Sequence, residues 1–525
     1  MHRIDTSCSY PLHGVRGTRA IEQATAARLA PNVLMQRAGL GVARLALALA
    51  PHARRIWVAC GPGNNGGDGF EAALQLKLRG IAAIVTWTGP PPGKPHASDA
   101  AAALQRALAA GVEVTLEVPP DFDFCIDALL GLGAALDPSR ESNAQIVRCL
   151  LAMQASDAPC LSVDLPSGLE ADTGVMSGGT SGSEPAIDSG AAYARANSTK
   201  QLFCLSLLTL KPGLFTSGGR DRAGEIWFDD LGTTSQSVEP TAWLQGQDRV
   251  RSTARSQALH RSHKGSFGDV AVVGGESDSQ RGSHMTGAAL LAARAALKAG
   301  AGRVYVALLG SGSPTVDPQQ PELMFRSPFA LDFSAMTVVC GCGGGASIRA
   351  ELPRILSTAK LSVIDADALN AIATDSQLQT LLKARGKRHA MTVLTPHPLE
   401  AAHLLGTTAA AVQADRLAAA GQLAARFGCV VVLKGSGTVI TAPGRTPVIN
   451  PTGNALLATA GTGDVLAGML GAALAGLAGV SSQQTSPENA FSVACGVVFS
   501  HGALADRWLH ERPGQALTAS MLGDF

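Results

Sequence analysis

The sequence predicts an α/β protein with two successive domains. Three observations support this prediction: short apolar runs alternate with helical segments in each half of the 525 residues, a glycine-rich motif follows an apolar run in each half, and small residues dominate the chain. The 59 glycines and the hydrophobic fraction of 46% suit helices that lie close on a parallel sheet. A chain of this length is expected to hold about two to four domains.

The N-terminal half is expected to begin with helical sequence up to about residue 50 and then to alternate between strands and helices. Strands are predicted at 55–60, 81–88, 124–129 and 160–164, with helices at 98–110 and 144–155. This alternation indicates a parallel, doubly wound, Rossmann-like sheet. Two apolar segments, 207–214 and 224–229, are expected to close the domain after a Gly/Ser-rich loop at 174–192.

The C-terminal half repeats the alternation. Strands are predicted at 269–273, 303–308, 337–340, 361–364, 392–394, 430–433 and 439–441. Helices are predicted at 286–298, 366–373, 398–405, 415–427 and 463–477. The domains predicted from this organisation are residues 1–235 and 256–515, joined by a linker at 236–255.

Composition excludes several classes of partner. The net charge is +1 with no run of Lys or Arg, so we expect no binding to nucleic acid. The ten cysteines form no Cys-x-x-Cys pair, which is typical of free core thiols in a cytoplasmic protein. The N-terminus has no apolar signal segment, and the apolar stretch 465–480 is shorter than a membrane span. We therefore expect a buried helix there and no membrane contact. A homo-oligomer is also expected.

Three polar motifs follow strands of the N-terminal half. The first, Gly61-Pro-Gly-Asn-Asn-Gly-Gly-Asp68-Gly, directs backbone N–H groups and a helix N-terminus at an anion, while its Asn and Asp oxygens could hold a cation or ribose hydroxyls. Asp127 and Asp164 end two other strands, where a carboxylate suits acid–base work or cation binding. Each motif alone fits helix capping equally well. Three at the strand ends of one domain favour a functional site.

The C-terminal half also has a glycine-rich motif that ends in Asp, Gly461-Thr-Gly-Asp464. A phosphate could rest on its N–H groups with Asp464 beside the reacting hydroxyl, as phosphoryl transfer requires. Asp365 and Asp367 end another strand, and helix capping or a magnesium or phosphate role is equally open for them. His397 stands between two prolines, which fixes its position and favours a ligand contact. The cationic glycine turn from Lys434 to Thr438 suits a nucleotide phosphate.

The order of the three N-terminal motifs, together with Met35-Gln-Arg-Ala-Gly, resembles that of the NAD(P)HX epimerase (YjeF N-terminal) family. That family interconverts the R and S epimers of NADHX and NADPHX, which are hydrated nicotinamide dinucleotides. The resemblance implies that Asp164 contacts the reacting ring and that potassium is held by Asn65, Asp127 and Ser167. The other substrate-binding residues that it implies are Asn64, Asn65, Gly66, Gly67, Asp68, Gly131, Leu132, Gly133, Ala134, Ala135, Leu136 and Asp137. The family commonly has Gly-Thr-Gly where this chain has Gly-Leu132-Gly, so one loop hydroxyl is missing.

The C-terminal motifs, in their order over about residues 260–510, resemble the ADP-dependent NAD(P)HX dehydratase family, a branch of the ribokinase-like fold. The resemblance implies ADP as cosubstrate, with ATP as the alternative, and magnesium. The implied nucleotide contacts are Lys434, Gly435, Ser436, Gly437, Thr438 and Gly463. The implied substrate contacts are Ala288, Gly343, His397 and Asp464. Two departures from the family pattern are Cys342, in Gly-Cys-Gly-Gly-Gly, and Leu399, in Thr-Pro-His-Pro-Leu-Glu.

Together the two resemblances imply a bifunctional repair enzyme. Asp164 and Asp464 are the predicted catalytic residues, with Asp464 as the base when the hydroxyl of S-NAD(P)HX is phosphorylated by ADP. Phosphate would then leave, which gives NAD(P)H, AMP and phosphate. The alternative is a ribokinase-like kinase of a vitamin-precursor alcohol, in which the N-terminal half is a non-catalytic nucleotide-binding module.

Overall fold

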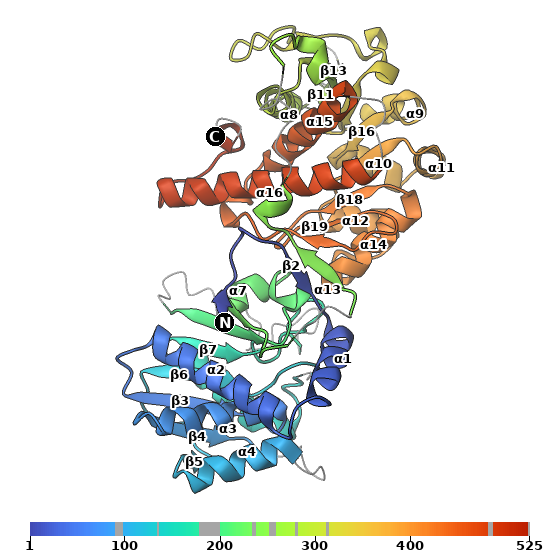
Figure 1. Ribbon diagram of the computed structural model, residues 1–525. Helices are drawn as coiled ribbons and strands as arrows, with labels where there is room; N and C mark the ends of the chain where they lie inside the picture. The colour runs from blue at the N-terminus through green and yellow to red at the C-terminus, as the bar shows by residue number, and fades with distance from the viewer. Residues whose placement is uncertain are drawn as a thin grey trace. The chain divides into compact units, whose positions relative to one another are not determined.

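The computed structural model describes residues 1–89, 98–133, 136–177, 200–233, 238–250, 259–278, 282–310, 314–480 and 487–522. The chain divides into two compact units (Figure 1). Unit 1 comprises Met1–Asp5 and Tyr10–Ala242, and unit 2 comprises Thr6–Ser9 and Trp243–Phe525. Each unit contains one central sheet with helices, so the predicted α/β class is confirmed.

The sheet of unit 1 is parallel except at one edge. Its strands, in spatial order, are β1 (His2–Arg3), β9 (Glu225–Asp229), β8 (Leu202–Leu207), β7 (Cys160–Val163), β6 (Phe124–Ala128), β3 (Arg55–Cys60), β4 (Ala82–Trp87) and β5 (Glu113–Thr115). Only β1 runs antiparallel, against β9. The chain leaves β3 for β4 on one side and later returns to β6 on the other. Such a reversal of strand order is where doubly wound sheets bind ligands.

Helices cover both faces of this sheet. They are α1 (Val15–Ala26), α2 (Val33–Leu49), α3 (Asn64–Lys77), α4 (Ser98–Ala109), α5 (Ala144–Ala155) and α7 (Gly219–Ala223). Because successive side chains of a strand point to opposite faces, Val58 packs into a core with α2, α3 and α4, while Ala59 packs into a second core with α5. Both cores consist of buried apolar side chains, as a sheet covered on two sides requires.

Unit 2 has a longer sheet. Its strands, in spatial order, are β14 (Met324–Phe325), β13 (Arg303–Gly310), β11 (Asp269–Asp278), β15 (Thr337–Cys340), β16 (Leu361–Ile364), β17 (Met391–Leu394), β18 (Val430–Leu433), β19 (Val439–Thr441), β20 (Val448–Ile449) and β10 (Ala242–Leu244), with β12 (Ser283–His284) beside β11. From β14 to β18 the strands are parallel. β19 runs antiparallel to both of its neighbours, β18 and β20.

The helices of unit 2 form a layer on each face of the sheet. They are α8 (Thr286–Lys298), α9 (Ile348–Thr358), α10 (Ala366–Ala373), α11 (Ser376–Lys387), α12 (Pro398–Leu405), α13 (Ala409–Ala414), α14 (Arg416–Phe427), α15 (Thr462–Val480), α16 (Pro487–Glu511) and α17 (Ala519–Leu522). α8, α15 and α16 share one core with the sheet, and α9 to α14 share the other. The predicted burial of the apolar stretch after Asp464 is confirmed, since α15 supplies Leu466 and Leu470 to the first core.

The first residues of the chain differ from the helical prediction. β1 and β2 (Tyr10–Leu12) precede the first helix, because β1 completes the sheet edge beside β9. Between them, Thr6–Ser9 belongs to unit 2, where the Ser9 hydroxyl donates to Asp248 at 2.7 Å and accepts from the Gly246 N–H at 2.9 Å. The segment predicted at 207–214 is largely the loop after β8, which starts earlier than expected at Leu202.

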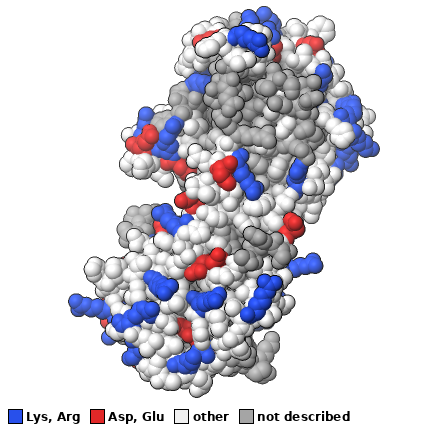
Figure 2. Space-filling view, viewed as in Figure 1, with Lys and Arg blue, Asp and Glu red and all other residues white. Residues whose placement is uncertain are grey.

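Charged side chains are dispersed on the surface. On the face drawn in Figure 2, Lys and Arg side chains lie in separate small groups with Asp and Glu among them. Among the described residues, no helix combines the length and the apolar character that a membrane span needs.

The turn from β3 into α3 depends on glycine at position 61. A Cβ atom there would overlap the carbonyl oxygen of Leu129, at the end of the neighbouring strand β6. We therefore expect Gly61→Ala to lower the free energy of unfolding by about 1–3 kcal/mol, as overpacking does. Gly63→Ala is the matched control, because a Cβ at Gly63 meets no atom within 4 Å. Urea unfolding of both variants measures the difference, and equal stabilities would contradict this account.

Candidate active sites

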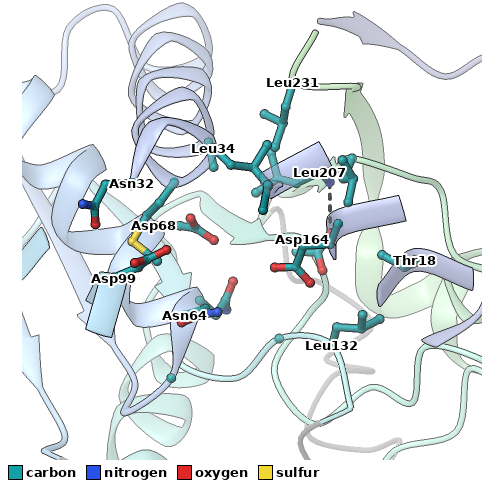
Figure 3. A pocket seen from close by; sticks show the side chains of 18 of the residues that line it. Thr18, Asn32, Leu34, Asn64, Asp68, Asp99, Leu132, Asp164, Leu207 and Leu231 are labelled. Atoms are coloured by element: carbon teal, nitrogen blue, oxygen red, sulfur yellow. Dashed lines mark hydrogen bonds between the residues drawn. The ribbon is translucent and has the colours of Figure 1, made fainter. Parts of the chain in front are cut away.

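Unit 1 contains a cavity of about 540 Å³ at the carboxyl ends of β3, β6 and β7. It lies where the strand order reverses, as expected for a doubly wound sheet. Its predicted residues come from three loops, and helices α1, α2 and α4 complete the wall. Figure 3 shows Asp68 and Asp164 on opposite sides of the open space, with both carboxyl groups facing it.

The first loop brings Asn64, Asn65 and Asp68 to the cavity, because they occupy the opening turns of α3 directly after β3. Gly66 and Gly67 are buried behind them and allow the helix to lie close to its neighbours. A Cβ at Gly66 would overlap the carbonyl oxygen of Gly61, and a Cβ at Gly67 would lie 2.6 Å from the side chain of Met35. These two glycines shape the wall, while the Asn and Asp side chains reach the cavity.

The second loop contributes less than the resemblance implies. Gly131 and Leu132 line the cavity, and Gly133 has a positive φ of 76°. Leu136 is buried in the core beside α5, and Asp137 accepts from Ser139 at 2.6 Å with its side chain 45% exposed. Neither Leu136 nor Asp137 lines the cavity. Ala134 and Ala135 lie outside the described residues.

Asp164 forms a buried ion pair that the motifs did not reveal. Its partner is Lys211, whose side chain has no exposed surface and which also donates to the carbonyl of Leu207 at 2.8 Å. Asp164 has a φ of 69°, and its carboxylate accepts from the Leu207 N–H at 3.0 Å. The strained backbone and these donors fix the orientation of the carboxylate at the cavity wall.

Two other carboxyl groups of the cavity have altered proton affinity. Burial, followed by the charge of Asp164, raises the pKa of Asp68 well above its ordinary value. Burial, again followed by Asp164, raises the pKa of Glu22. A cavity in which one carboxylate is ion-paired and others favour the protonated form can both accept and donate protons.

Asp127 and Ser167 contact each other directly. The Ser167 hydroxyl donates to Asp127 at 2.6 Å and its N–H donates at 2.9 Å. Burial raises the pKa of Asp127, against the effect of these hydrogen bonds. Asn65 is 8% exposed, and its Nδ2 has no hydrogen-bond partner among the described residues. Since amide O and N positions are interchangeable assignments, this buried amide can present an oxygen to the interior.

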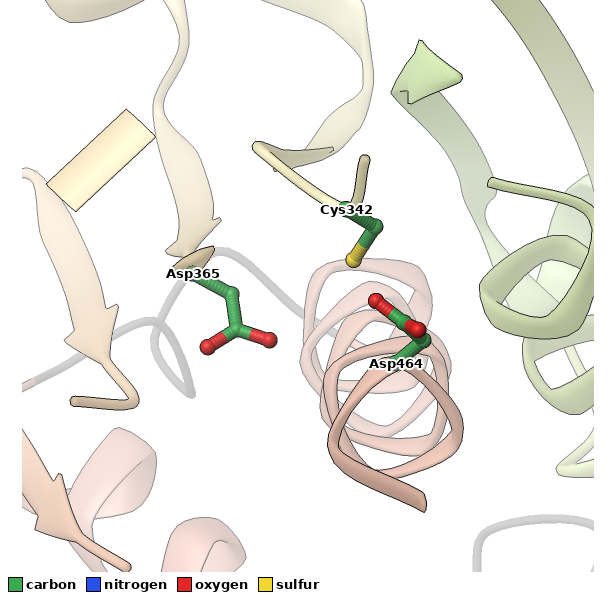
Figure 4. Close-up of side chains that lie close together, drawn as sticks. All are labelled: Cys342, Asp365 and Asp464. Atoms are coloured by element: carbon green, nitrogen blue, oxygen red, sulfur yellow. The ribbon is translucent and has the colours of Figure 1, made fainter. Parts of the chain in front are cut away.

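The site of unit 2 is centred on Asp464, in the first turn of α15 after Gly461 and Gly463. The side chains of Cys342 and Asp365 approach it, and one ligand atom from each of the three lies within 4.8 Å of the others (Figure 4). Burial, followed by the charge of Asp365, raises the pKa of Asp464 to about 6. The Cys342 thiol forms a hydrogen bond with Asp464 that acts in the opposite direction.

Lys434 is the cation of this site. Its Nζ lies 2.8 Å from Asp365 and 3.9 Å from Glu400. Burial disfavours the charged ammonium, but these two carboxylates raise the pKa of Lys434. Burial raises the pKa of Glu400 to about 7. The ring of His397 pairs with Glu400 at 3.2 Å and caps α12, accepting from the Leu399 N–H at 3.1 Å, with 47% of its side chain exposed.

The glycine loop after β15 requires residues without a Cβ. At Gly343, where φ is 57°, a Cβ would lie 2.6 Å from the Met285 carbonyl oxygen and 3.0 Å from the Ala288 Cβ. Two predicted substrate contacts, Gly343 and Ala288, are thus neighbours. Glu276 fixes the far side of the loop by accepting from the Ser347 hydroxyl at 2.6 Å.

The turn from Lys434 to Thr438 rests on a buried arginine. Arg416 is 1% exposed and donates to the carbonyls of Leu433 and Lys434, both at 3.2 Å. Gly435 and Ser436 are exposed, so the backbone of this turn is open to a ligand.

The sequence motifs do not reveal four contributors to the sites: Lys211, Glu276, Cys342 and Arg416. Arg416 follows a predicted helix start, and Cys342 departs from the family pattern. The available signal was a single basic residue beside an apolar run, as at Lys211 and Arg416. Such residues are rarely buried unless they are paired.

The Lys434–Asp365 pair should respond to mutation as a buried ion pair. Lys434→Met leaves Asp365, 1% exposed, without its cation, so we expect a loss of about 3–5 kcal/mol in the free energy of unfolding. The double variant K434M/D365N removes the isolated charge and should recover part of that loss. Urea unfolding of both variants and of D365N measures the coupling. If the stability losses of the two single variants simply add up to the loss of the double variant, Lys434 and Asp365 do not interact directly.

Models of known protein families match both halves of the chain. The family model described as NAD(P)H-hydrate dehydratase matches residues 270–524, and the YjeF-related protein N-terminus matches residues 31–199. The bifunctional NAD(P)H-hydrate repair enzyme Nnr of Escherichia coli K12 is 35% identical over 494 residues, covering 90% of this chain and 84% of that protein.

Two further relatives match the C-terminal half. The ADP-dependent (S)-NAD(P)H-hydrate dehydratase of Neisseria meningitidis is 44% identical over 252 residues, which cover 47% of this chain and 78% of that protein. A crystal structure of the Bacillus subtilis ADP/ATP-dependent NAD(P)H-hydrate dehydratase, with ATP and Mg²⁺, is 30% identical with a TM-score of 0.43, covering 53% of this chain and 92% of that one. The identity to the Escherichia coli enzyme over 90% of this chain and 84% of that protein shows that this chain belongs to the family of bifunctional NAD(P)H-hydrate repair enzymes.

Proposed function

We propose that unit 1 epimerises R- and S-NAD(P)HX and that unit 2 dehydrates S-NAD(P)HX to NAD(P)H with ADP. The observation that carries the proposal is Asp464, a carboxyl group of raised pKa in the first turn of α15, near the partly buried cation Lys434. A helix N-terminus with a neighbouring ammonium suits a transferring phosphoryl group. A carboxylate beside it suits removal of the hydroxyl proton.

In unit 2, the Asp464 carboxylate takes the proton of the ring hydroxyl, and the hydroxyl oxygen attacks the terminal phosphorus of ADP. The bond to AMP breaks, and the electrons leave with the AMP oxygen. Phosphate is a better leaving group than hydroxide, so it departs from the ring carbon as the ring nitrogen supplies electrons. Loss of a proton from the adjacent carbon then restores the double bond of NAD(P)H.

Different residues around Asp464 bind the nucleotide and NAD(P)HX. We propose that the turn Lys434, Gly435, Ser436, Gly437 and Thr438, with Gly463, binds the phosphates of ADP or ATP. Ala288, Gly343 and His397 bind NAD(P)HX. Magnesium would neutralise the phosphates when bound, and the carboxylate of Asp365 is an oxygen ligand of the type it takes.

In unit 1 we propose that Asn64, Asn65, Asp68, Gly131, Leu132 and Asp164 contact the substrate in the cavity. Potassium would be held by the oxygen atoms of Asp127 and Ser167 and by the side-chain amide of Asn65, whose Nδ2 has no hydrogen-bond partner among the described residues. A bound potassium ion would fix the loops that carry these three residues.

Two further features belong to the proposal. The ten cysteines are free, which fits a reducing, cytoplasmic location. A homo-oligomer remains a prediction. The relatives favour hydrate repair over the alternative of a vitamin-precursor kinase with a non-catalytic N-terminal module.

The test is recovery of NADH absorbance from a mixture of R- and S-NADHX, with ADP or ATP and with or without potassium. Complete conversion supports both activities. Conversion that stops when the S epimer is consumed would contradict the epimerase assignment. No conversion with either nucleotide would contradict the dehydratase assignment.

Replacing the proposed base should remove dehydration. We expect Asp464→Asn to lower kcat for S-NADHX with ADP by about 10²- to 10⁴-fold, because the amide cannot accept the proton. Epimerisation without nucleotide is the control reaction, since unit 1 is unchanged. Near wild-type dehydration by this variant would exclude Asp464 as the base.

The pH dependence of dehydration should report the same group. The base acts when ionised, and the pKa of Asp464 is raised to about 6. Activity should therefore be present above about pH 6 and fall about tenfold per pH unit below it. A profile of kcat/KM against pH for S-NADHX checks this expectation, and a flat acidic limb would contradict it.

A further inference from the structure

The cavity of unit 1 holds two carboxyl groups in opposite electrostatic surroundings. Asp164 is ion-paired with Lys211, whereas Asp68 forms no hydrogen bond to any described residue. Both line the cavity and face its open space (Figure 3). Pairs of titratable groups with contrasting surroundings divide the acid and base roles in many enzymes.

Lys211 is built into the wall as a rigid cation. Its side chain is fully buried, and its Nζ donates to Asp164, to the Leu207 carbonyl at 2.8 Å and to the Ser206 hydroxyl at 3.4 Å. An ammonium has three protons, so these acceptors account for all of them. Lys211 therefore has no proton free for the substrate, and its effect passes through Asp164.

Asp68 lacks such a partner. Burial raises its pKa well above the ordinary value, and the charges of Asp164, Glu22 and Glu71 add to this effect, against Lys211. Glu71 itself is bound by Arg106 at 2.7 Å. The charged or titratable groups around the cavity are His13, Arg19, Glu22, Asp68, Glu71, Asp99, Asp164 and Lys211. The surroundings of Asp68 thus favour its protonated form, and its carboxyl group faces the cavity.

We infer that Asp68 is a second catalytic residue of the proposed epimerase, acting as proton donor, and that Lys211 is a positioning residue that holds Asp164 as the proton acceptor. This inference rests on the proposed function of unit 1. It gives Asp68 a role in the reaction beyond binding substrate.

The hydroxyl group of the hydrate is bonded to the ring carbon next to the nitrogen. The ring can therefore open at this carbon to give a carbonyl group. Asp164 takes the hydroxyl proton, the C=O bond forms as the C–N bond breaks, and Asp68 gives its proton to the nitrogen. Rotation about the bond next to the carbonyl group then turns the opposite face of the carbonyl carbon toward the nitrogen. The nitrogen then re-forms the C–N bond, returning its proton to Asp68, while Asp164 returns a proton to the oxygen. Atoms and electrons balance, and no oxidant or reductant is needed.

The test for Asp68 compares Asp68→Asn with wild-type protein by following the ratio of R- to S-NADHX without nucleotide, so that unit 2 is silent. We expect epimerisation to slow by about 10²-fold or more, since the amide keeps the shape but has no transferable acid proton. Asp99→Asn is the matched control, because Asp99 lines the same cavity, has no proposed role and does not contribute to the raised pKa of Asp68. A D68N rate within about threefold of wild type would overturn the inference for Asp68.

The test for Lys211 uses the pH profile of kcat/KM for epimerisation. Lys211→Met removes the cation that favours an ionised carboxylate, so the acidic limb should move upward by about one pH unit or more. Lys211→Arg keeps the charge and should leave the limb near its wild-type position. If Lys211→Met does not fold, Lys211→Gln removes the charge and takes its place. An acidic limb at the wild-type pH in a folded variant that lacks the charge would overturn the role of Lys211. Wild-type protein that does not epimerise at all would contradict the proposed function itself.

Discussion

The parallel arrangement of strands is the constraint on which both sites depend. Parallel strands bring their carboxyl ends to one edge of a sheet, so loops far apart in sequence must meet there. In unit 1 this edge joins the loops that follow β3, β6 and β7. In unit 2 it joins the loops after β15, β16 and β18 to the start of α15. Glycines at Gly61 and Gly343 permit the close backbone contacts that this convergence needs.

The two units use a similar electrostatic arrangement on different sheets. Each has a lysine paired with an aspartate that ends a strand: Lys211 with Asp164, and Lys434 with Asp365. Each has a second carboxyl group, Asp68 or Asp464, whose pKa is raised by burial and by the charge of the paired aspartate. In such a site the lysine stabilises the negative charge of its aspartate, while the second carboxyl group can accept or donate a proton.

Much of the fold could be predicted because buried parallel strands are continuous apolar runs bounded by glycine and polar residues. Strands 55–60, 337–340 and 430–433 were therefore located to the residue. The short edge strand β1 and the placement of Thr6–Ser9 in unit 2 could not be predicted, because they depend on partners more than 200 residues away in the sequence. Motifs located Asp164 and Asp464, whereas Lys211 was missed because its role arises only from tertiary contacts.

Because Thr6–Ser9 belongs to unit 2, the two units are connected covalently at more than one place. The backbone passes from one unit to the other after residues 5, 9 and 242, so three peptide segments join them. A gene fragment that starts at residue 243 encodes a unit 2 without the Ser9 hydroxyl that binds Asp248 and Gly246. Separate chains carrying each complete unit would therefore require a rearranged gene, in which the codons for Thr6–Ser9 are moved to the second half.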